Sequence, residues 1–214
     1  VLPALAMAKT LVVAGDPQQL RHYSFLAKSQ EQRIAQALEL NENEVASFRE
    51  ISFLDFVDQY LLQTGQPTAM TLLDEHYRSV PSLMQFNSDQ FYNGDIEVLT
   101  GLSQSAKDQP LHLNWHYCDG KRLDKVNADE AAALIRFLQE RIEGEKNLSS
   151  KSSLGVLSFF RDQAEYLKKE ILQAISLQDI RQHRLKIGTP FSFQGEERDH
   201  IIISCAIDNE THHG

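Results

Sequence analysis

The chain has 214 residues, of which 42% are hydrophobic and 24% are charged, and its formal net charge at pH 7 is −9. This composition is ordinary for a globular protein with a sizeable core, and the length provides for one large domain or parts of two. The negative charge excludes a uniformly basic protein that coats nucleic acid, although it is compatible with a local basic groove.

Cysteine usage and the lengths of the apolar runs indicate the cellular compartment of the protein. Cys118 and Cys205 are too few for a disulfide scaffold or a zinc cluster, so we expect reduced thiols in a cytoplasmic protein, or in a nuclear one in a eukaryote. No apolar run approaches the ~20 residues of a membrane span, so we expect no membrane partner. Lys9 interrupts the apolar start of the chain, and no basic segment precedes it, which excludes a signal peptide. Because the chain begins with Val1 rather than Met, we expect a fragment of a longer protein.

The first polar cluster follows a predicted strand. Residues 11–14 form a short apolar run typical of a buried strand, and Gly15 and the residues after it leave Asp16 and Gln19 exposed at the end of that strand. The amide of Gln19 is suited to hold a terminal phosphate or the water that attacks it. An ordinary type I turn explains the same residues equally well.

Two helices come next. Residues 29–40 predict a polar helix. A second helix begins at a capping box formed by Ser52 and Asp55. Residues 65–67, Gly-Gln-Pro, stop this helix, so we place a candidate domain boundary after residue 68.

The second polar cluster precedes a third helix, which Pro81 is suited to start. Arg78 offers a planar fork of donors for phosphate oxygens, and Tyr77 offers a flat face for a base. An arginine supplied by a second domain can neutralise the charge that develops in phosphoryl transfer. The alternative is a surface salt bridge from Arg78 to Asp74 or Glu75, with Tyr77 in the core.

Residues 111–117 alternate between apolar and polar side chains and predict a strand. His112 and His116 would share one face of it, but residues four apart on a strand are separated by roughly 13 Å. One zinc ion cannot bind both at about 2 Å, so we predict exposed histidines and no metal site.

The remainder of the chain alternates between helices and strands. Asn127 predicts the N-cap of a strong helix, with Glu130 at the capping-box position. A strand at residues 154–158 and a helix follow, and the isoleucine run at residues 201–203 is typical of a strand covered on both faces. This rhythm predicts an α/β fold with a mostly parallel sheet covered by helices.

The third polar cluster lies between the last two predicted strands. Thr189 is suited to hydrogen-bond a nucleic-acid phosphate, and Glu197 is suited to accept a ribose hydroxyl. Gly195 lets the backbone approach a ligand closely. The alternative is a charged, solvated hairpin.

Four segments together resemble conserved motifs of superfamily 1 helicases, in the same order. GDPQQL is similar to the third motif, LDEHYRSVPSLMQFNSDQFY to the fourth, and IGTPFSFQGEERDHIIIS to the fifth. SLGVLSFFRDQAEYLKKEI is similar to the strand and helix between the last two in the Upf1-like branch of that superfamily. Each motif alone is weak, whereas the ordered set covers most of the chain.

The resemblance implies two RecA-like α/β domains of the P-loop NTPase type, each a three-layer fold. ATP and Mg²⁺ would bind between them, and single-stranded DNA or RNA would run across both. Residues 1–68 would be the C-terminal part of the first motor domain, and residues 69–214 would be the second, without its C-terminal end.

The resemblance also implies roles for individual residues. Gln19, with Asp16 beside it, would sense the γ-phosphate, and Arg78 would be the arginine finger. The remaining residues implied at the nucleotide are Tyr77, Gln194, Gly195 and Glu197, and those implied at the nucleic acid are Thr189, Arg161 and Gln163.

Three features of the family are absent from these 214 residues. No G-x-x-x-x-G-K-[ST] phosphate loop occurs, nor do the acidic magnesium motif and the last, arginine-bearing motif. We therefore expect the fragment to hydrolyse no ATP by itself and to need the missing part of the first motor domain as a partner. Two alternatives stay open: a nucleic-acid-binding remodeller or scaffold with a degenerate motor, and an unrelated α/β nucleotide-binding protein.

Overall fold

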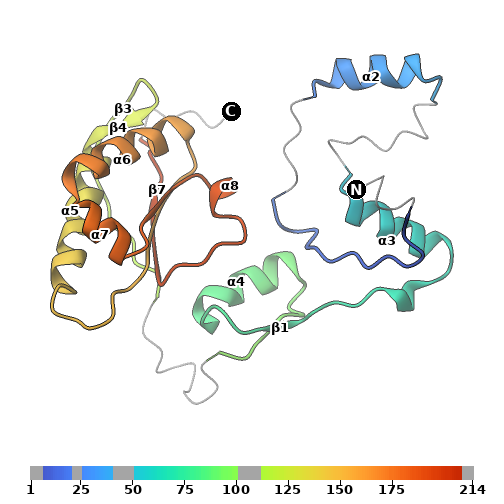
Figure 1. The fold of residues 1–214 in the computed structure, drawn as a ribbon, viewed down its shortest axis with the longest axis horizontal. Coiled ribbons are helices and arrows are strands. Elements are labelled where there is room, and N and C mark those ends of the chain that lie inside the picture. The colour runs from blue at the N-terminus through green and yellow to red at the C-terminus, as the bar shows by residue number, and fades with distance from the viewer. Residues whose placement is uncertain (1–6, 21–25, 41–50, 101–111, 209–214) are drawn as a thin grey trace. The chain divides into compact units, whose positions relative to one another are not determined.

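A computed structural model describes residues 7–20, 26–40, 51–100 and 112–208 (Figure 1). The chain divides into two compact units, Val1–Asn114 and Trp115–Gly214, and each is described by itself. This division does not test the predicted motor-domain boundary after residue 68, which stays a prediction. No helix in the described ranges is long and apolar enough to cross a lipid bilayer.

The second unit is built on a parallel sheet of three strands in the order β6-β5-β7. The middle strand pairs in parallel with both of its neighbours, and Val156 lies opposite Ile187 on one side and Ile202 on the other. The α/β class with a parallel sheet is therefore confirmed. In chain order the elements are β3 (Arg122–Leu123), β4 (Val126–Asn127), α5 (Ala128–Gly144), β5 (Leu154–Ser158), α6 (Arg161–Ala174), α7 (Leu177–Gln182), β6 (Lys186–Gly188), α8 (Pro190–Phe193) and β7 (His200–Ser204).

The core of this unit lies between the sheet and helices α5 and α6. Both helices repeat apolar residues at helical spacing, so each presents one apolar stripe to the sheet. The stripes pack against the side chains of β5 that point the same way, as the strand alternation requires. The fully buried members are Leu138, Leu154, Val156, Leu167 and Ile171.

The opposite face of the sheet is largely open in the described residues. The short helix α8 packs there, with Phe193 beside Gly155, and Figure 1 shows it on the other side of β7 from α5 and α6. Ile201 and Ile203 point to this face and are 43% and 48% exposed. The expectation that this strand is covered on both faces is therefore wrong for the described chain, because α8 is too short to span it.

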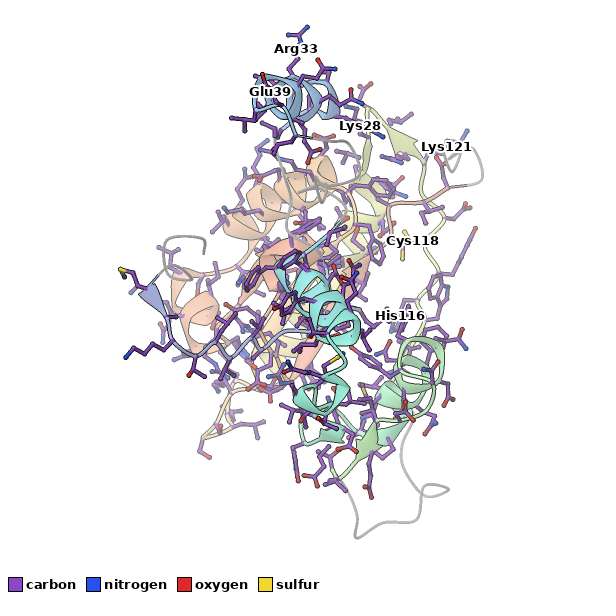
Figure 2. The ribbon with its side chains drawn as sticks, turned by 90° about the vertical axis from the view of Figure 1, so that its right-hand side faces the viewer. Lys28, Arg33, Glu39, His116, Cys118 and Lys121 are labelled. Carbon is purple, nitrogen blue, oxygen red and sulfur yellow. The ribbon has the colours of Figure 1, made fainter. Side chains whose placement is uncertain are left out.

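The first unit contains α2 (Lys28–Ala37), α3 (Phe53–Gln63), the 3₁₀ turn η1 (Pro67–Ala69), β1 (Glu75–His76), α4 (Pro81–Phe91) and β2 (Glu97–Val98). All three predicted helices are confirmed. Ser52 and Asp55 form the expected capping box, with Asp55 N donating to Ser52 Oγ at 3.1 Å and Ser52 N donating to Asp55 Oδ2 at 2.8 Å. Gly65, at φ +71°, follows α3 in the left-handed conformation that ends many helices. Figure 2 shows Arg33 extending outward from α2.

Two predicted strands are wrong. Residues 11–14 form no strand, and Leu11 and Val12 are exposed. Residues 112–117 are also unpaired, and Trp115 is 80% exposed; Leu111 lies outside the described residues. Figure 2 shows His116, Cys118 and Lys121 along this extended stretch. The physical reason is common to both segments: an apolar pattern is local, whereas a strand exists only where a neighbouring backbone accepts and donates its hydrogen bonds.

Candidate functional site

The turn after residue 15 brings two predicted site residues together. Asp16 Oδ1 accepts a hydrogen bond from Gln18 N at 3.0 Å, and Asp16 Oδ2 accepts one from Gln19 Nε2 at 2.9 Å. The backbone bond from Gln19 N to Asp16 O, at 3.3 Å, closes the turn. The segment is thus a turn, as one alternative had it, and it also presents the Gln19 amide at the surface.

Tyr92 is a third member of this cluster, and it does not appear among the predicted site residues. Its hydroxyl donates to Asp16 Oδ2 at 2.6 Å. Burial raises the pKa of Tyr92 to about 12, with the Asp16 bond adding to it. Burial also pushes the pKa of Asp16 upward, but the bonds from Tyr92, Gln18 and Gln19 outweigh it and leave that pKa below its ordinary value. The pair is therefore a protonated phenol on an ionised carboxylate. Its two members are 76 residues apart, so no local pattern indicates it.

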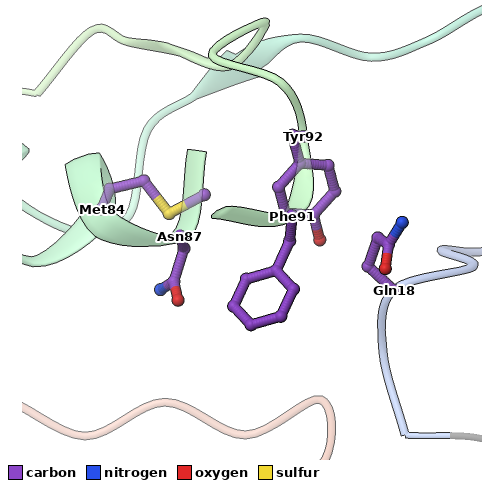
Figure 3. Close-up of a pocket in the computed structure, with 5 residues that line it drawn as sticks. All are labelled: Gln18, Met84, Asn87, Phe91 and Tyr92. Carbon is purple, nitrogen blue, oxygen red and sulfur yellow. The ribbon is translucent and has the colours of Figure 1, made fainter. Parts of the chain in front are cut away.

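A small cavity of about 200 Å³ adjoins this cluster (Figure 3). Figure 3 shows the rings of Phe91 and Tyr92 on one side and Gln18 on the other. The end of helix α4 and the turn after residue 15 thus lie next to each other. The lining is completed by Met84 and Asn87.

Tyr77 and Arg78 directly follow strand β1, which pairs with β2 in parallel. Tyr77 is 65% exposed, so the alternative that places it in the core is wrong. Its hydroxyl donates to a carboxylate oxygen of Glu75, and this bond is the first cause of the raised pKa of Tyr77. Arg78 is exposed as well. Consecutive residues thus expose a flat ring, suited to a base, and a guanidinium, suited to a phosphate group.

The carboxyl edge of the three-stranded sheet carries two predicted nucleic-acid contacts. Arg161 follows β5 and begins α6, and Thr189 follows β6 and precedes α8. Because these neighbouring strands are parallel, both residues lie at the same edge of the sheet, where open α/β sheets bind ligands. Arg161 is exposed, and its side chain makes no hydrogen bond or ion pair to any described residue. The Thr189 side chain does not cap α8.

The position of Gln163 does not fit its predicted place near a nucleic acid. It is fully buried, and its amide bonds the backbone of Asn127 in both directions: Asn127 N donates to Oε1 at 2.9 Å, and Nε2 donates to Asn127 O at 3.1 Å. Nε2 also donates to Ser204 Oγ at 3.1 Å. Gln163 therefore holds elements of the fold together in this conformation, and no ligand reaches its amide.

Only half of the predicted capping box at α5 forms. Asn127 caps the helix as expected, since its side chain accepts from Glu130 N at 3.0 Å. The reciprocal bond to Asn127 N comes from Gln163, whereas the Glu130 carboxylate accepts from Ser204 Oγ and from the backbone of Ala206. A tertiary contact has replaced the local one.

The loop after α8 presents the other predicted nucleotide residues. Gln194, Gly195 and Glu197 are exposed, and Gly195 has φ +75°, a conformation that glycine adopts readily. Because β6 and β7 both pair with β5 and not with each other, the hairpin alternative is wrong.

Charged neighbours hold that loop. Glu196 forms ion pairs with Lys186 at 3.0 Å and with Arg198 at 2.9 Å. Both contacts lower the pKa of Glu196, and the contact with Lys186 has the larger effect. Arg198 also donates to the carbonyl oxygen of Glu197 at 2.6 Å. Sequence reasoning missed this role of Glu196, for which the mixture of acidic and basic side chains at residues 196–199 is the only signal.

The described residues differ in how well they fit a nucleotide and a metal ion. The exposed ring of Tyr77 and the guanidinium of Arg78 fit a nucleotide. No cluster of three or more His, Cys, Asp or Glu side chains suited to a metal ion occurs within the described ranges.

Comparison with known proteins places these features in a family. A family model described as an AAA domain matches residues 53–214. The chain is 31% identical over 162 residues to the DNA polymerase alpha-associated DNA helicase A of Saccharomyces cerevisiae, covering 64% of this chain and 23% of that protein. It is 28% identical over 226 residues to the RNA helicase Mov10l1 of Homo sapiens, covering 94% and 17%. It is 27% identical over 157 residues to the regulator of nonsense transcripts 1 homolog of Drosophila melanogaster, covering 64% and 12%. The chain thus spans less than a quarter of the length of these curated relatives.

Proposed function

This chain belongs to the AAA-domain family of the Upf1-like branch of superfamily 1 helicases, and we propose that it forms part of an ATP-dependent motor that translocates along single-stranded DNA or RNA and unwinds duplexes. The motor would contain residues 1–68 in its first RecA-like domain and residues 69–214 in its second. The phosphate loop, the magnesium ligands and the last arginine motif would come from parts of the protein outside these 214 residues.

The observation that carries the proposal is the position of Arg161 and Thr189 at one carboxyl edge of a parallel sheet. A guanidinium and a hydroxyl are both suited to phosphate oxygens, and such contacts fix a strand without reading its sequence. A motor that moves along a strand needs sequence-independent contacts of this kind.

ATP hydrolysis transfers the γ-phosphoryl group to water, and charge develops on its oxygens in the transition state. Arg78 would supply donors to those oxygens. Gln19 would orient the attacking water, and Tyr77 and Glu197 would hold the adenine and the ribose. Asp16 accepts bonds from Gln18, Gln19 and Tyr92, which supports a role in positioning Gln19 rather than direct contact with the nucleotide.

The test is steady-state ATP hydrolysis by the full-length protein, with and without single-stranded DNA and RNA. We expect stimulation by at least one of the two. Arg78→Ala should lower kcat by about 10³-fold or more and leave nucleotide affinity within a few-fold, because an arginine finger acts mainly in the transition state. Arg33→Ala, on the exposed surface of α2, is the matched control.

Two outcomes would contradict this proposal. An unchanged kcat in the Arg78 variant would remove the arginine-finger assignment. Tight binding of single strands without any ATP hydrolysis by the full-length protein would favour the remodeller or scaffold with a degenerate motor.

A further inference from the structure

We propose that Tyr92 is a positioning residue of the motor: its hydroxyl, hydrogen-bonded to Asp16 Oδ2 at 2.6 Å, couples the turn that carries Gln19 to the segment that carries Arg78. The inference rests on the proposed function and deepens it, because it names the contact by which the water-orienting amide and the arginine finger keep a fixed relation.

On one side of this contact, Asp16 fixes the Gln19 side chain. The carboxylate receives Gln19 Nε2 at 2.9 Å through the same oxygen, Oδ2, that receives the Tyr92 hydroxyl. Because one N–H of the amide is held by Asp16, the amide oxygen is directed away from the carboxylate, as an acceptor for water. A change in the position of Asp16 would therefore rotate the amide of Gln19.

On the other side, the segment around Tyr92 is braced to the strand that precedes Arg78. Tyr92 ends α4, and the turn that follows passes through Asn93 and Gly94 at positive φ. Ser88, which is buried, closes this turn, because its hydroxyl accepts from Ile96 N at 3.2 Å and its carbonyl oxygen accepts from Gly94 N at 2.9 Å.

The chain then enters β2, which pairs with β1 directly before Arg78. Glu97 N donates to Asp74 O at 2.7 Å, and Leu99 N donates to His76 O at 2.9 Å. The Thr100 hydroxyl bonds the carbonyl oxygen of Ser79, on the far side of Arg78. The backbone that carries Arg78 is therefore hydrogen-bonded on both sides to the segment that follows Tyr92.

The Tyr92–Asp16 bond thus joins two hydrogen-bonded groups, one around Gln19 and one around Arg78. Under the proposed motor-domain boundary after residue 68, the bond would join the first motor domain to the second, forming when the cleft between them closes and breaking when it opens. A hydrogen bond to a charged acceptor changes such an equilibrium by about 10–100-fold. The ionised state of Asp16 and the raised pKa of Tyr92 maintain the bond at neutral pH.

The deciding experiment measures ATP hydrolysis by the full-length protein with the Tyr92→Phe substitution, which keeps the ring and removes only the hydroxyl. We expect kcat to fall by about 10–100-fold at saturating single-stranded nucleic acid, with the affinities for a fluorescent ADP analogue and for the strand within about twofold of wild type. Tyr117→Phe, in an exposed stretch of the second unit, is the matched control.

A double-mutant cycle distinguishes positioning from general stability. Asp16→Asn combined with Tyr92→Phe should be no slower than the more impaired single variant, because both changes remove one contact. An unchanged kcat in Tyr92→Phe, additive losses in the double variant, or a loss that disappears when the assay is cooled below the melting temperature of the variant would each overturn the inference. If wild type shows no nucleic-acid-stimulated hydrolysis, the proposed function fails and this inference fails with it. An active wild type with an unaffected Tyr92 variant overturns this inference alone.

Discussion

The side-chain amide of Gln163 binds both backbone groups of Asn127, accepting from its N–H at 2.9 Å and donating to its carbonyl oxygen at 3.1 Å. Asn127 is the N-cap of α5, and Gln163 lies in the first turn of α6. The same amide reaches Ser204 at the end of β7. One buried side chain therefore fixes the starts of two helices and the end of a strand, all at the carboxyl edge of the sheet.

Gln163→Leu should lower the free energy of unfolding by about 2–4 kcal/mol, because the N–H and carbonyl groups of Asn127 would stay buried without a partner while the volume of the side chain is kept. Urea denaturation of the purified chain would measure the loss. Gln173→Leu, on the exposed side of the same helix, should change stability by less than about 0.5 kcal/mol. Equal losses in the two variants would show that the buried amide contributes nothing specific.

Alanine substitutions at Gly120 and at Gly144 should change the stability of the second unit in opposite directions. A Cβ atom on Gly120 would lie 2.4 Å from Asn127 Oδ1 and 2.9 Å from the Cβ of Asp129. Asn127 cannot move away freely, because the same oxygen caps α5 through Glu130 N. Gly120→Ala should therefore destabilise the second unit by about 1–3 kcal/mol, measured as a lower melting temperature.

Gly144→Ala is expected to have the opposite sign. Gly144 is the last residue of α5, and apart from its chain neighbours and the adjoining helix backbone a Cβ atom there would meet no heavy atom within 4 Å. Alanine has the higher helix propensity and restricts the unfolded chain, so stability should rise by about 0.5–1 kcal/mol. If both substitutions shift the melting temperature in the same direction, the crowding around Gly120 is not what the structure indicates.

The sequence predicted those elements whose determinants are local. The alternating helix and strand signals from residue 127 onward, and the capping box at Ser52 and Asp55, were sufficient because each pattern extends over a few neighbouring residues. Residues 11–14 carry the same apolar signal but form no strand, since strand formation needs hydrogen-bond partners from other segments.

The same distinction between local and long-range determinants applies to the candidate site. Arg161 and Thr189 could be placed at one edge because each follows a recognisable strand of a parallel sheet. The role of Gln163 could not be predicted, because its partner Asn127 is 36 residues away and a glutamine in the first turn of a helix is equally suited to face solvent. For the same reason Tyr92 was missed: its spacing along α4 predicts packing and does not identify the carboxylate that it bonds.

Acid should weaken the second unit through Asp199. Ser153 is buried and donates to Asp199 Oδ2 from its hydroxyl at 2.6 Å and from its N–H at 2.7 Å, and these bonds, the hydroxyl first, lower the pKa of Asp199. A carboxyl whose pKa is lowered on folding stabilises the fold above its unfolded pKa of about 3.9, and this stabilisation is lost as the pH falls through the lower folded value. Wild type should therefore lose stability as the pH falls below about 4.

Asp199→Asn isolates this contribution. The variant should be less stable than wild type at pH 6, and the difference in melting temperature should narrow as the pH falls below about 4. Glu145, whose pKa is lowered first by the bond from the Ser152 hydroxyl, titrates in both proteins and cancels in the comparison. Glu165→Gln, on the exposed side of α6, controls for the loss of one negative charge. A gap that stays constant with pH would exclude Asp199 as the titrating group.

Arg161 should contribute one ionic contact to a single strand. It is exposed at the carboxyl edge of the sheet, as the first residue of the helix that follows β5. If it binds a phosphate, Arg161→Ala weakens binding of the full-length protein about equally for strands of different sequence, by roughly tenfold at low salt. The slope of log K against log salt concentration should also decrease by about 0.7, which corresponds to one counterion released from a single strand.

Arg181→Ala is the matched control, because α7 directly precedes β6 and so lies at the amino edge of the same sheet. Both substitutions remove one exposed positive charge from the second unit, so a general effect of net charge would appear equally in both. A change in slope for Arg161 alone would locate the strand at the carboxyl edge. If the slope changed equally in both variants, the phosphate contacts would lie elsewhere. The assignment of Thr189, at the same edge of the sheet, as a phosphate contact would then lose its support.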